Sequence, residues 1–393
     1  MAKIHFDEER AAFTPILAME EASRCLLCLD APCSKMCPAG TDPAKFIRSL
    51  RFKNVKGAAK TIRENNPLGG VCARVCPTEH YCEQGCSRSG IDRPIDIARL
   101  QRYATDMEAA FGLELVKPGP SNGKKVAVVG GGPAGLTAAA MLARSGCQVT
   151  VFEKQGKAGG YCRYGIPSYR LPEAVLDQEI AHIEALGVKI SHFAPANEVD
   201  ELRKHYDAVV VADGLGEAKT LPLFEDNPYT MTAIDFLAKA KQGEIPDVRH
   251  VLVIGGGDVA MDVATTCKKA GIEQVSDVVY ETLSEFKASK AELEGARNAG
   301  VSIYDGFVPS GVKKNVVTFL HRKAEITMTL EADLIVLAVG QQRLPSQLGE
   351  PTDRDNIFYC GDIVEGDKTV VCAVKTGKEA AARALAYLGG DQQ

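Results

Sequence analysis

One supersecondary pattern occurs twice in this chain, and it constrains the fold more than any other feature. Each copy is a short apolar strand, a glycine loop, a helix and a second strand. The first copy has its elements at 126–129, 130–135, 134 to about 145, and 148–153. The second copy has them at 250–254, 255–257, 258–270 and 275–281. Two such βαβ units predict nucleotide-binding domains built on parallel sheets.

The first loop, Gly130-Gly131-Gly132-Pro133-Ala134-Gly135, fits the G-x-G-x-x-G pattern. In this pattern the first glycine turns tightly, the second lets a pyrophosphate approach the backbone, and the third lets helix and strand pack closely. Glu153 follows Gly132 by 21 residues, at the end of the next strand. A carboxylate there accepts hydrogen bonds from ribose hydroxyls. The alternative interpretation is a tight turn without a ligand.

The second loop, Gly255-Gly256-Gly257-Asp258-Val259-Ala260, fits the G-x-G-x-x-A variant. Glu281 lies 24 residues beyond Gly257, at the end of the following strand. An acidic residue at this position favours the free 2′-hydroxyl of NADH and repels the 2′-phosphate of NADPH. The sequence therefore predicts NADH as the nicotinamide substrate. The alternative is that Glu281 is a solvated strand end.

Two dinucleotide sites imply two dinucleotides. We expect FAD in the first site and NADH in the second, so that hydride passes to the flavin. A late strand at 357–360 ends in Gly361-Asp362, and a helix begins at about Thr369-Val370, which fits the ribityl and pyrophosphate groups of FAD. The candidate NAD-binding residues are Gly255, Gly257, Asp258, Val259, Glu281 and Gly340, the last of which follows an apolar strand.

Eight of the 13 cysteines lie within the first 86 residues. The spacing Cys25-x₂-Cys28-x₄-Cys33-x₃-Cys37-Pro resembles a ferredoxin run, in which the fourth cysteine serves a different cluster. A second group follows, at Cys72, Cys76, Cys82 and Cys86. The eight could fill two 4Fe–4S clusters. Zinc is the alternative, but it prefers paired C-x₂-C knuckles, and this segment has one such pair.

The five remaining cysteines share no spacing and are expected to be packing residues: Cys147, Cys162, Cys267, Cys360 and Cys372. None forms a C-x₂-C pair beside a nucleotide loop, so the sequence does not support a thiol-reductase dithiol centre. The formal net charge of −5 argues against a general nucleic-acid binder. No apolar signal-peptide core and no run of about 20 apolar residues is found, so we expect a cytoplasmic protein that does not bind membranes.

The predicted fold class is α + α/β, with a helical two-cluster domain followed by two Rossmann-type domains, the FAD domain being interrupted by the NAD domain. Helices are expected at 42–50 and 94–101, and a Pro/Gly-rich linker at 117–123. The expected domains are an iron–sulfur domain at 1–116, an FAD domain at 122–218 and 336–393, and an NAD(H) domain at 219–335.

Several strings resemble the dihydropyrimidine dehydrogenase and glutamate synthase small-subunit superfamily over nearly the whole chain. They are Glu21–Cys28, Pro32-Cys33, Asn66–Gly69, Val75–Thr78, Glu153–Gln155, Gly159-Gly160, Gly165–Pro167, Tyr169–Pro172 and Gly361–Val371. With the first glycine loop, the resemblance implies this set of FAD-binding residues: Gly130, Gly132, Pro133, Ala134, Gly135, Glu153, Lys154, Gly160, Tyr161, Arg170, Gly361, Asp362, Thr369 and Val370.

The resemblance also implies interleaved clusters. One would be held by Cys25, Cys28, Cys33 and Cys86, and the other by Cys37, Cys76, Cys82 and Gln101. Cys72 would then not be a ligand, in contrast to the simpler count of eight cysteines. A glutamine oxygen is a harder, neutral ligand, so it should perturb the potential of its cluster.

The resemblance further implies that the substrate is reduced elsewhere. In this superfamily uracil or thymine meets an FMN in an FMN/iron–sulfur catalytic subunit, and this chain has no sequence left for a barrel of about 250 residues. We expect the chain to be the NADH-facing electron-input subunit of an NAD-dependent dihydropyrimidine dehydrogenase hetero-oligomer. The segment between Gly340 and Gly361 is shorter than is usual in the superfamily, which leaves contacts there open.

Two alternatives stay open from the sequence. One is a glutamate synthase small-subunit-type NAD(P)H:acceptor oxidoreductase. The other is a redox-sensing or cluster-scaffold protein whose nucleotide folds are not catalytic.

Overall fold

The computed structural model describes residues 8–195, 199–343 and 351–389. The chain forms two compact units. The larger unit contains residues 8–163, 170–215 and the segment after 350, and the smaller contains 164–169 and 216–343. Among the described residues no helix has the length and apolar character that a membrane span requires.

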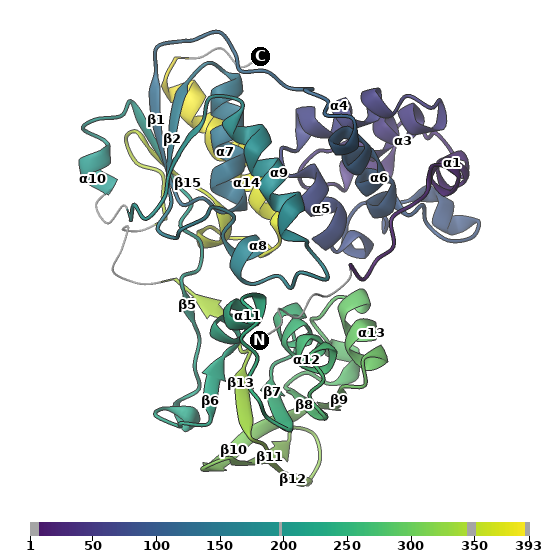
Figure 1. The fold of residues 1–393 in the computed structure, drawn as a ribbon, viewed down its shortest axis with the longest axis vertical. Coiled ribbons are helices and arrows are strands. Elements are labelled where there is room, and N and C mark those ends of the chain that lie inside the picture. The colour runs from purple at the N-terminus through teal and green to yellow at the C-terminus, as the bar shows by residue number, and fades with distance from the viewer. Residues whose placement is uncertain (1–7, 196–198, 344–350, 390–393) are drawn as a thin grey trace. The chain divides into compact units, whose positions relative to one another are not determined.

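The first part of the larger unit is helical, as predicted (Figure 1). Its helices enclose an apolar core that includes Phe46, Leu50 and Leu100. The helices are α1 (Pro15–Ser23), α2 (Pro32–Lys35), α3 (Pro43–Arg51), α4 (Val55–Asn65), α5 (Gly69–Val75) and α6 (Ile97–Ala110).

The helix predicted at 94–101 begins later, at Ile97, and continues to Ala110. Asp96 is the reason for the later start, because its side chain accepts a hydrogen bond from Arg99 N and caps the helix. Asp42 caps α3 in the same way, by accepting from Lys45 N. Both caps fix the start of a helix next to a cysteine loop.

The second part of the larger unit is a parallel sheet in the order β15-β4-β1-β2-β3. Helices α7 (Pro133–Arg144) and α14 (Val370–Tyr387) pack against each other and against the sheet (Figure 1). The strands are β1 (Lys125–Val129), β2 (Gln148–Phe152), β3 (Lys189–Ser191), β4 (Ala208–Val211) and β15 (Ile357–Tyr359), and further helices are α8 (Tyr161–Tyr164), α9 (Glu173–Glu184) and α10 (Val199–Leu202).

Strand β15 pairs with β4 although about 145 residues of chain separate the two strands. In this parallel pair Ile357 lies opposite Val209. The chain therefore leaves the first sheet, forms the smaller unit and returns to complete the first sheet. This confirms the predicted fold class, in which one Rossmann-type domain interrupts the other.

The smaller unit has its own parallel sheet in the order β6-β13-β7-β8-β9, with α11, α12 and α13. An antiparallel sheet β10-β11-β12 packs through Val317 and Phe319 on an apolar cluster that includes Leu252. The parallel strands are β6 (Thr230–Thr232), β7 (His250–Ile254), β8 (Gln274–Val279), β9 (Ser302–Asp305) and β13 (Leu334–Leu337). The other elements are α11 (Ala233–Lys241), α12 (Asp258–Lys269), α13 (Lys290–Asn298), β5 (Glu217–Ala218), β10 (Phe307–Lys313), β11 (Val316–His321), β12 (Thr327–Glu331) and β14 (Gln341–Gln342).

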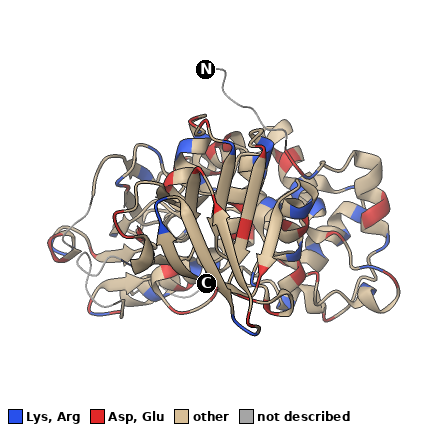
Figure 2. Cartoon of the chain, turned by 90° about the horizontal axis from the view of Figure 1, so that it is seen from below, with Lys and Arg blue, Asp and Glu red and all other residues tan. Residues whose placement is uncertain are grey.

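Figure 2 shows that most of the length of the sheet strands carries neither acidic nor basic residues. Lysine, arginine, aspartate and glutamate are intermingled on the helices and loops. The strands β1, β4, β7 and β13 have four or more buried positions each, which is typical of parallel sheets covered on both faces.

Candidate dinucleotide and iron–sulfur sites

The first glycine loop lies between β1 and α7, at the carboxyl edge of the parallel sheet. Gly130 has φ +100°, and a Cβ on it would lie 2.3 Å from the carbonyl oxygen of Ala212 on the loop after β4. A Cβ on Gly135 would lie 2.0 Å from Gly130 O. A side chain at Gly130 would therefore clash with the loop after β4 and require a strained backbone, which fits the tight turn that the pattern predicts there. A side chain at Gly135 would push α7 away from the end of β1, which fits the packing role that the pattern predicts for the third glycine.

Glu153 lies directly after β2 and is buried against this loop. Its Oε2 accepts from Gly131 N at 2.9 Å, and its Oε1 accepts from Gln155 N at 2.8 Å. The two backbone donors fix the carboxylate beside the glycine loop. Gly160 lies against the same loop, because a Cβ on it would be 2.8 Å from Gly132 Cα.

Residues from the end of the chain complete this edge of the sheet. Gly361, directly after Cys360, has φ +83°, and a Cβ there would lie 3.0 Å from Ala134 Cβ. Gly361 N donates to Thr376 Oγ1 on α14 at 3.0 Å. Thr369 caps α14 by accepting from Cys372 N, and burial raises the pKa of Asp362.

The other predicted FAD residues lie on the elements that border this edge. Pro133 and Val370 are the first residues of α7 and α14, and Tyr161 is the first residue of α8. Lys154 is exposed one residue after Glu153, whereas Arg170 is half-buried in the segment before α9. The structure therefore brings together the first loop, Glu153, Gly160 and Gly361. Lys154 is exposed beside them.

The second glycine loop repeats this arrangement in the smaller unit. A Cβ on Gly255 would lie 2.4 Å from Ala338 O, as a Cβ on Gly130 would meet Ala212 O. A Cβ on Gly256 would lie 2.6 Å from Glu281 Oε2, as a Cβ on Gly131 would meet Glu153. Strand β8 ends at Val279, so Glu281 lies just beyond it rather than within it.

The remaining predicted NAD residues lie around this loop. Gly257 precedes α12, which begins with Asp258 and Val259. Asp258 Oδ1 accepts from Ser289 N at 2.6 Å, so this carboxylate ties α12 to the segment before α13. Gly340 has φ +101° and accepts from Lys219 N through its carbonyl oxygen at 3.0 Å.

The sequence did not single out two basic residues near Glu281. Lys287 Nζ forms an ion pair with Glu281 Oε1 at 2.7 Å. The guanidinium of Arg322 lies over the ring of Tyr280, 3.8 Å from its centroid. No pattern pointed to them, because both come from connecting segments outside the βαβ unit.

Four cysteines line one cavity in the helical segment. They are Cys25, Cys28, Cys33 and Cys86, the four that the family resemblance assigns to one cluster. Burial, followed by the charges of Cys86 and Cys25, raises the pKa of Cys33 to about 11. Ile95 N donates to Cys86 Sγ at 3.5 Å. A cation or cluster with positive charge would offset the cost of placing thiolates together here.

The resemblance assigns Cys37, Cys76 and Cys82 to the other cluster, and these three are named the second cysteine group. Burial raises the pKa of both Cys76 and Cys82, and the charge of Cys37 adds to this in each. Cys72 lies in the same neighbourhood. Burial is the main cause that raises the pKa of Cys72, and the charge of Cys37 raises it further. Among the described residues no three His, Cys, Asp or Glu side chains are close enough to hold one ion.

Gln101 lies on α6, which packs on α5. Its Nε2 donates to Gly69 O at the start of α5 at 2.7 Å. This bond fixes the carboxamide and leaves its oxygen as the end that can act as a ligand. Gln101 is therefore bound to the start of α5, the helix that carries Cys72.

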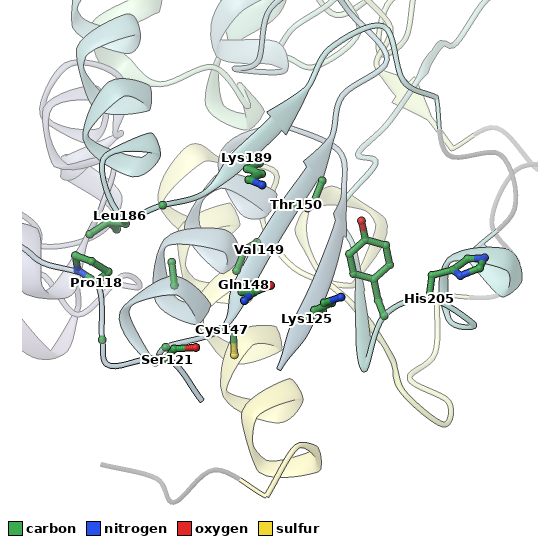
Figure 3. A pocket seen from close by; sticks show the side chains of 15 residues that line it. Pro118, Ser121, Lys125, Cys147, Gln148, Val149, Thr150, Leu186, Lys189 and His205 are labelled. Carbon is green, nitrogen blue, oxygen red and sulfur yellow. The ribbon is translucent and has the colours of Figure 1, made fainter. Parts of the chain in front are cut away.

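A further cavity lies elsewhere on the sheet of the larger unit (Figure 3). Lys125, Gln148 and Lys189, which line it, are the first residues of β1, β2 and β3. Ligands of open parallel sheets bind at the carboxyl ends of the strands. This cavity at the amino ends is therefore separate from the glycine loop.

Comparisons with known proteins agree with these two kinds of site. The family described as dihydropyrimidine dehydrogenase domain II, 4Fe-4S cluster, matches residues 2–113. The family described as pyridine nucleotide-disulphide oxidoreductase matches residues 124–377. The fold and sites thus define an NADH-dependent oxidoreductase whose cofactors are FAD and 4Fe–4S clusters.

Relatives identify the family more closely. The chain is 51% identical over 402 residues to the NAD-dependent dihydropyrimidine dehydrogenase subunit PreT homolog of Salmonella typhi, covering 98% of this chain and 97% of the relative. It is 52% identical over 404 residues to PreT of Escherichia coli O157:H7, covering 98% of each. The chain belongs to the family of PreT subunits of NAD-dependent dihydropyrimidine dehydrogenase.

More distant relatives share part of this organisation. The NADP(+)-dependent formate dehydrogenase subunit beta of Moorella thermoacetica is 32% identical, over 91% of this chain and 60% of the relative. Lactococcus lactis thioredoxin reductase has the same fold, with a TM-score of 0.55 and 20% identity over 68% of this chain and 99% of that chain. Several relatives are named as subunits, so the chain is expected to work with a partner chain.

Proposed function

We propose that this chain is the electron-input subunit of an NAD-dependent dihydropyrimidine dehydrogenase. It would take electrons from NADH and deliver them to an FMN/iron–sulfur catalytic subunit that reduces uracil or thymine to the 5,6-dihydropyrimidine. We propose a cytoplasmic location for this hetero-oligomer. When bound, FAD accepts hydride and releases electrons singly, and 4Fe–4S clusters carry single electrons.

One cavity carries this proposal, because both kinds of site contribute to its lining. Pro38 and Tyr81 come from the cysteine segment, and Gly361 and Asp362 come from the carboxyl edge of the sheet. Pro38 directly follows a proposed cluster ligand, and Tyr81 directly precedes another. A chain that only bound a nucleotide would not need cysteine loops at this edge.

Tyr81 connects the two segments through its hydroxyl group. It donates to Asp367 Oδ2 at 2.9 Å and lies 3.4 Å from Thr369 Oγ1, the cap of α14. These contacts hold the loop before Cys82 on the start of α14. We infer that Tyr81 keeps the second cysteine group at a fixed distance from the FAD site.

The chain's own residues would bind and orient the groups. The proposed FAD residues are those of the first loop, Glu153, Lys154, Gly160, Tyr161, Arg170, Gly361, Asp362, Thr369 and Val370. The glycine loop and the N-termini of α7 and α14 would offer backbone N–H groups to the pyrophosphate. Glu153 would accept from the ribose hydroxyls, since it lies beside that loop.

The nicotinamide substrate would be held by Gly255, Gly257, Asp258, Val259, Glu281 and Gly340. Glu281 would select NADH by accepting from the ribose 2′-hydroxyl. The clusters would be held by Cys25, Cys28, Cys33 and Cys86, and by Cys37, Cys76, Cys82 and Gln101. The proposed domains are the helical domain at 1–116, the FAD domain at 122–218 and 336–393, and the NAD domain at 219–335.

Anaerobic reconstitution tests the proposal. The purified chain should reduce a dye acceptor with NADH, and it should support uracil-dependent NADH oxidation when mixed with the FMN/iron–sulfur subunit. Activity with a glutamate synthase large subunit instead would establish the alternative oxidoreductase. Flavin-loaded protein that reduces no dye would support a redox sensor.

A further inference from the structure

A lysine of the FAD domain reaches into the cysteine segment. Lys378 lies on α14, and its Nζ donates to Ala39 O at 2.7 Å and to Asn65 O at 2.9 Å. Ala39 is two residues from Cys37, a proposed ligand of the second cluster. The ammonium group is therefore bound to the cysteine segment, although its helix packs on the sheet.

The lysine and the sulfur of Cys37 share one backbone turn. Gly40 N donates to Cys37 O at 3.0 Å, and Thr41 N donates to Cys37 Sγ at 3.5 Å. A Cβ on Gly40 would lie 3.8 Å from Lys378 Nζ. A cation is thus bound to the turn that carries the Cys37 sulfur.

Burial lowers the pKa of Lys378, and the negative charge of Cys37 acts in the opposite direction. Two carbonyl oxygens bound to one nitrogen favour the ammonium form. A negatively charged cluster in place of the thiol would favour it further. Lys378 is half-buried, so water screens its charge less than that of an exposed lysine.

Capping of α4 accounts for only one of the two bonds. Asn65 is the last residue of α4, and Arg144 Nη1 donates to the neighbouring Glu64 O at 2.9 Å. Cations at a helix C-terminus are favourable, so both side chains stabilise the end of α4. The bond from Lys378 to Ala39 O lies outside that helix, on the Cys37 turn.

We propose that Lys378 raises the reduction potential of the cluster held by Cys37 and so favours electron entry into it. This inference rests on the proposed function, because it requires a cluster on Cys37. Reduction adds one negative charge to a cluster, and a fixed cation nearby stabilises the reduced form more than the oxidised form. Lys378 acts through this charge and does not touch the reacting atoms.

Redox titration of the anaerobically purified full chain, followed by electron paramagnetic resonance, tests the inference. Lys378→Met removes the charge, and Lys378→Gln removes it while keeping a donor for the carbonyl oxygens. Lys378→Arg keeps the charge. Lys60→Met is the matched control, because Lys60 lies on α4, whose last residue Lys378 contacts, but is exposed and pairs with Glu64 at 3.7 Å. Cys37→Ser assigns the signal of the affected cluster.

The expected result is that Lys378→Met and Lys378→Gln make reduction of the Cys37 cluster about tenfold less favourable, a potential lower by about 59 mV. The potential of the other cluster should not change in these variants. Both clusters should keep their wild-type potentials in Lys378→Arg and in Lys60→Met. If both neutral variants, Lys378→Met and Lys378→Gln, keep intact clusters with unchanged potentials, the inference is overturned while the proposed function stands. Loss of the cluster in both neutral variants would also overturn it, by making Lys378 a structural anchor. Absence of clusters from the wild-type chain would instead overturn the proposed function.

Discussion

Lys287 Nζ lies 2.7 Å from Glu281 Oε1, just beyond the second strand of the nicotinamide βαβ unit. The side chain of Glu281 is 12% exposed and that of Lys287 is 75% exposed. The residue expected to repel a 2′-phosphate is therefore paired with a cation that could bind one. We therefore expect Glu281 to decide which nicotinamide nucleotide the chain accepts.

Glu281→Gln should raise the KM for NADH roughly tenfold or more and lower the KM for NADPH. A hydrogen bond to a charged group contributes about 1.5–3 kcal/mol, and about 1.4 kcal/mol corresponds to tenfold in binding. Removing the carboxylate also releases Lys287 for the 2′-phosphate. Steady-state dye reduction with each nucleotide measures both changes.

The double variant Glu281→Gln with Lys287→Met is the control for this exchange. In this double variant the KM for NADPH should rise again, and the KM for NADH should stay as high as in Glu281→Gln. An unchanged ratio of NADH to NADPH efficiency in Glu281→Gln would refute the role of Glu281.

Arg63 should be essential for stability of the larger unit. It is buried between two carboxylates, with Nε 2.7 Å from Glu108 Oε2 and Nη1 2.5 Å from Glu179 Oε1. Arg63→Met leaves both acids buried without their cation, which should cost about 3–5 kcal/mol in the free energy of unfolding. Lys60→Met, which removes an exposed pair with Glu64, should change it by less than about 0.5 kcal/mol. Similar denaturant midpoints for the two variants would contradict this account.

Asp277 should make the smaller unit less stable as the pH rises. It is fully buried on β8, its two carboxylate oxygens have no hydrogen-bond partner among the described residues, and burial raises its pKa well above the usual value. Below the pKa of Asp277 in the unfolded chain, about 3.9, the carboxyl group is neutral in both states and does not lower the free energy of unfolding. Between that pKa and the raised pKa in the folded chain, the free energy of unfolding falls by at most about 1.4 kcal/mol per pH unit.

Asp277→Asn removes the titrating carboxyl group and keeps a side chain of nearly the same shape. Between about pH 5 and about pH 8 the variant should therefore lose less unfolding free energy than the wild type, as measured by denaturant titration at each pH. Parallel pH profiles for the two proteins would show that Asp277 does not titrate in this way.

Gln101 and Cys72 should respond differently to substitution. If Gln101 completes the second cluster, Gln101→Ala should alter the resonance spectrum and lower the iron content, because the cluster loses a ligand. Cys72→Ser should leave both unchanged. The opposite pattern would assign the fourth position to Cys72.

The repeated βαβ units were predictable because hydrophobic periodicity and glycine loops are local signals. The strands at Val126–Val129 and His250–Ile254 were predicted to within one residue. The helix predicted from 94 begins at Ile97, because Asp96 caps it and apolar spacing alone does not encode a cap. Local patterns therefore gave the elements and their order, with errors at the ends.

Contacts between distant segments were not predictable in this way. Lys287, Lys378 and Tyr81 carry no motif, and their roles depend on partners such as Glu281, Ala39 and Asp367. The grouping of Cys86 with Cys25 came from the family resemblance rather than from spacing. Such contacts depend on how loops pack, which periodicity does not encode.

The most direct test is to add NADH to the anaerobically purified chain and record flavin absorbance and cluster resonance together. The account predicts bound FAD, iron and sulfide for two 4Fe–4S clusters, and reduction of at least one cluster by NADH without any partner chain. A protein that binds FAD and is reduced by NADH while its iron stays oxidised, or that contains no iron, would contradict the account.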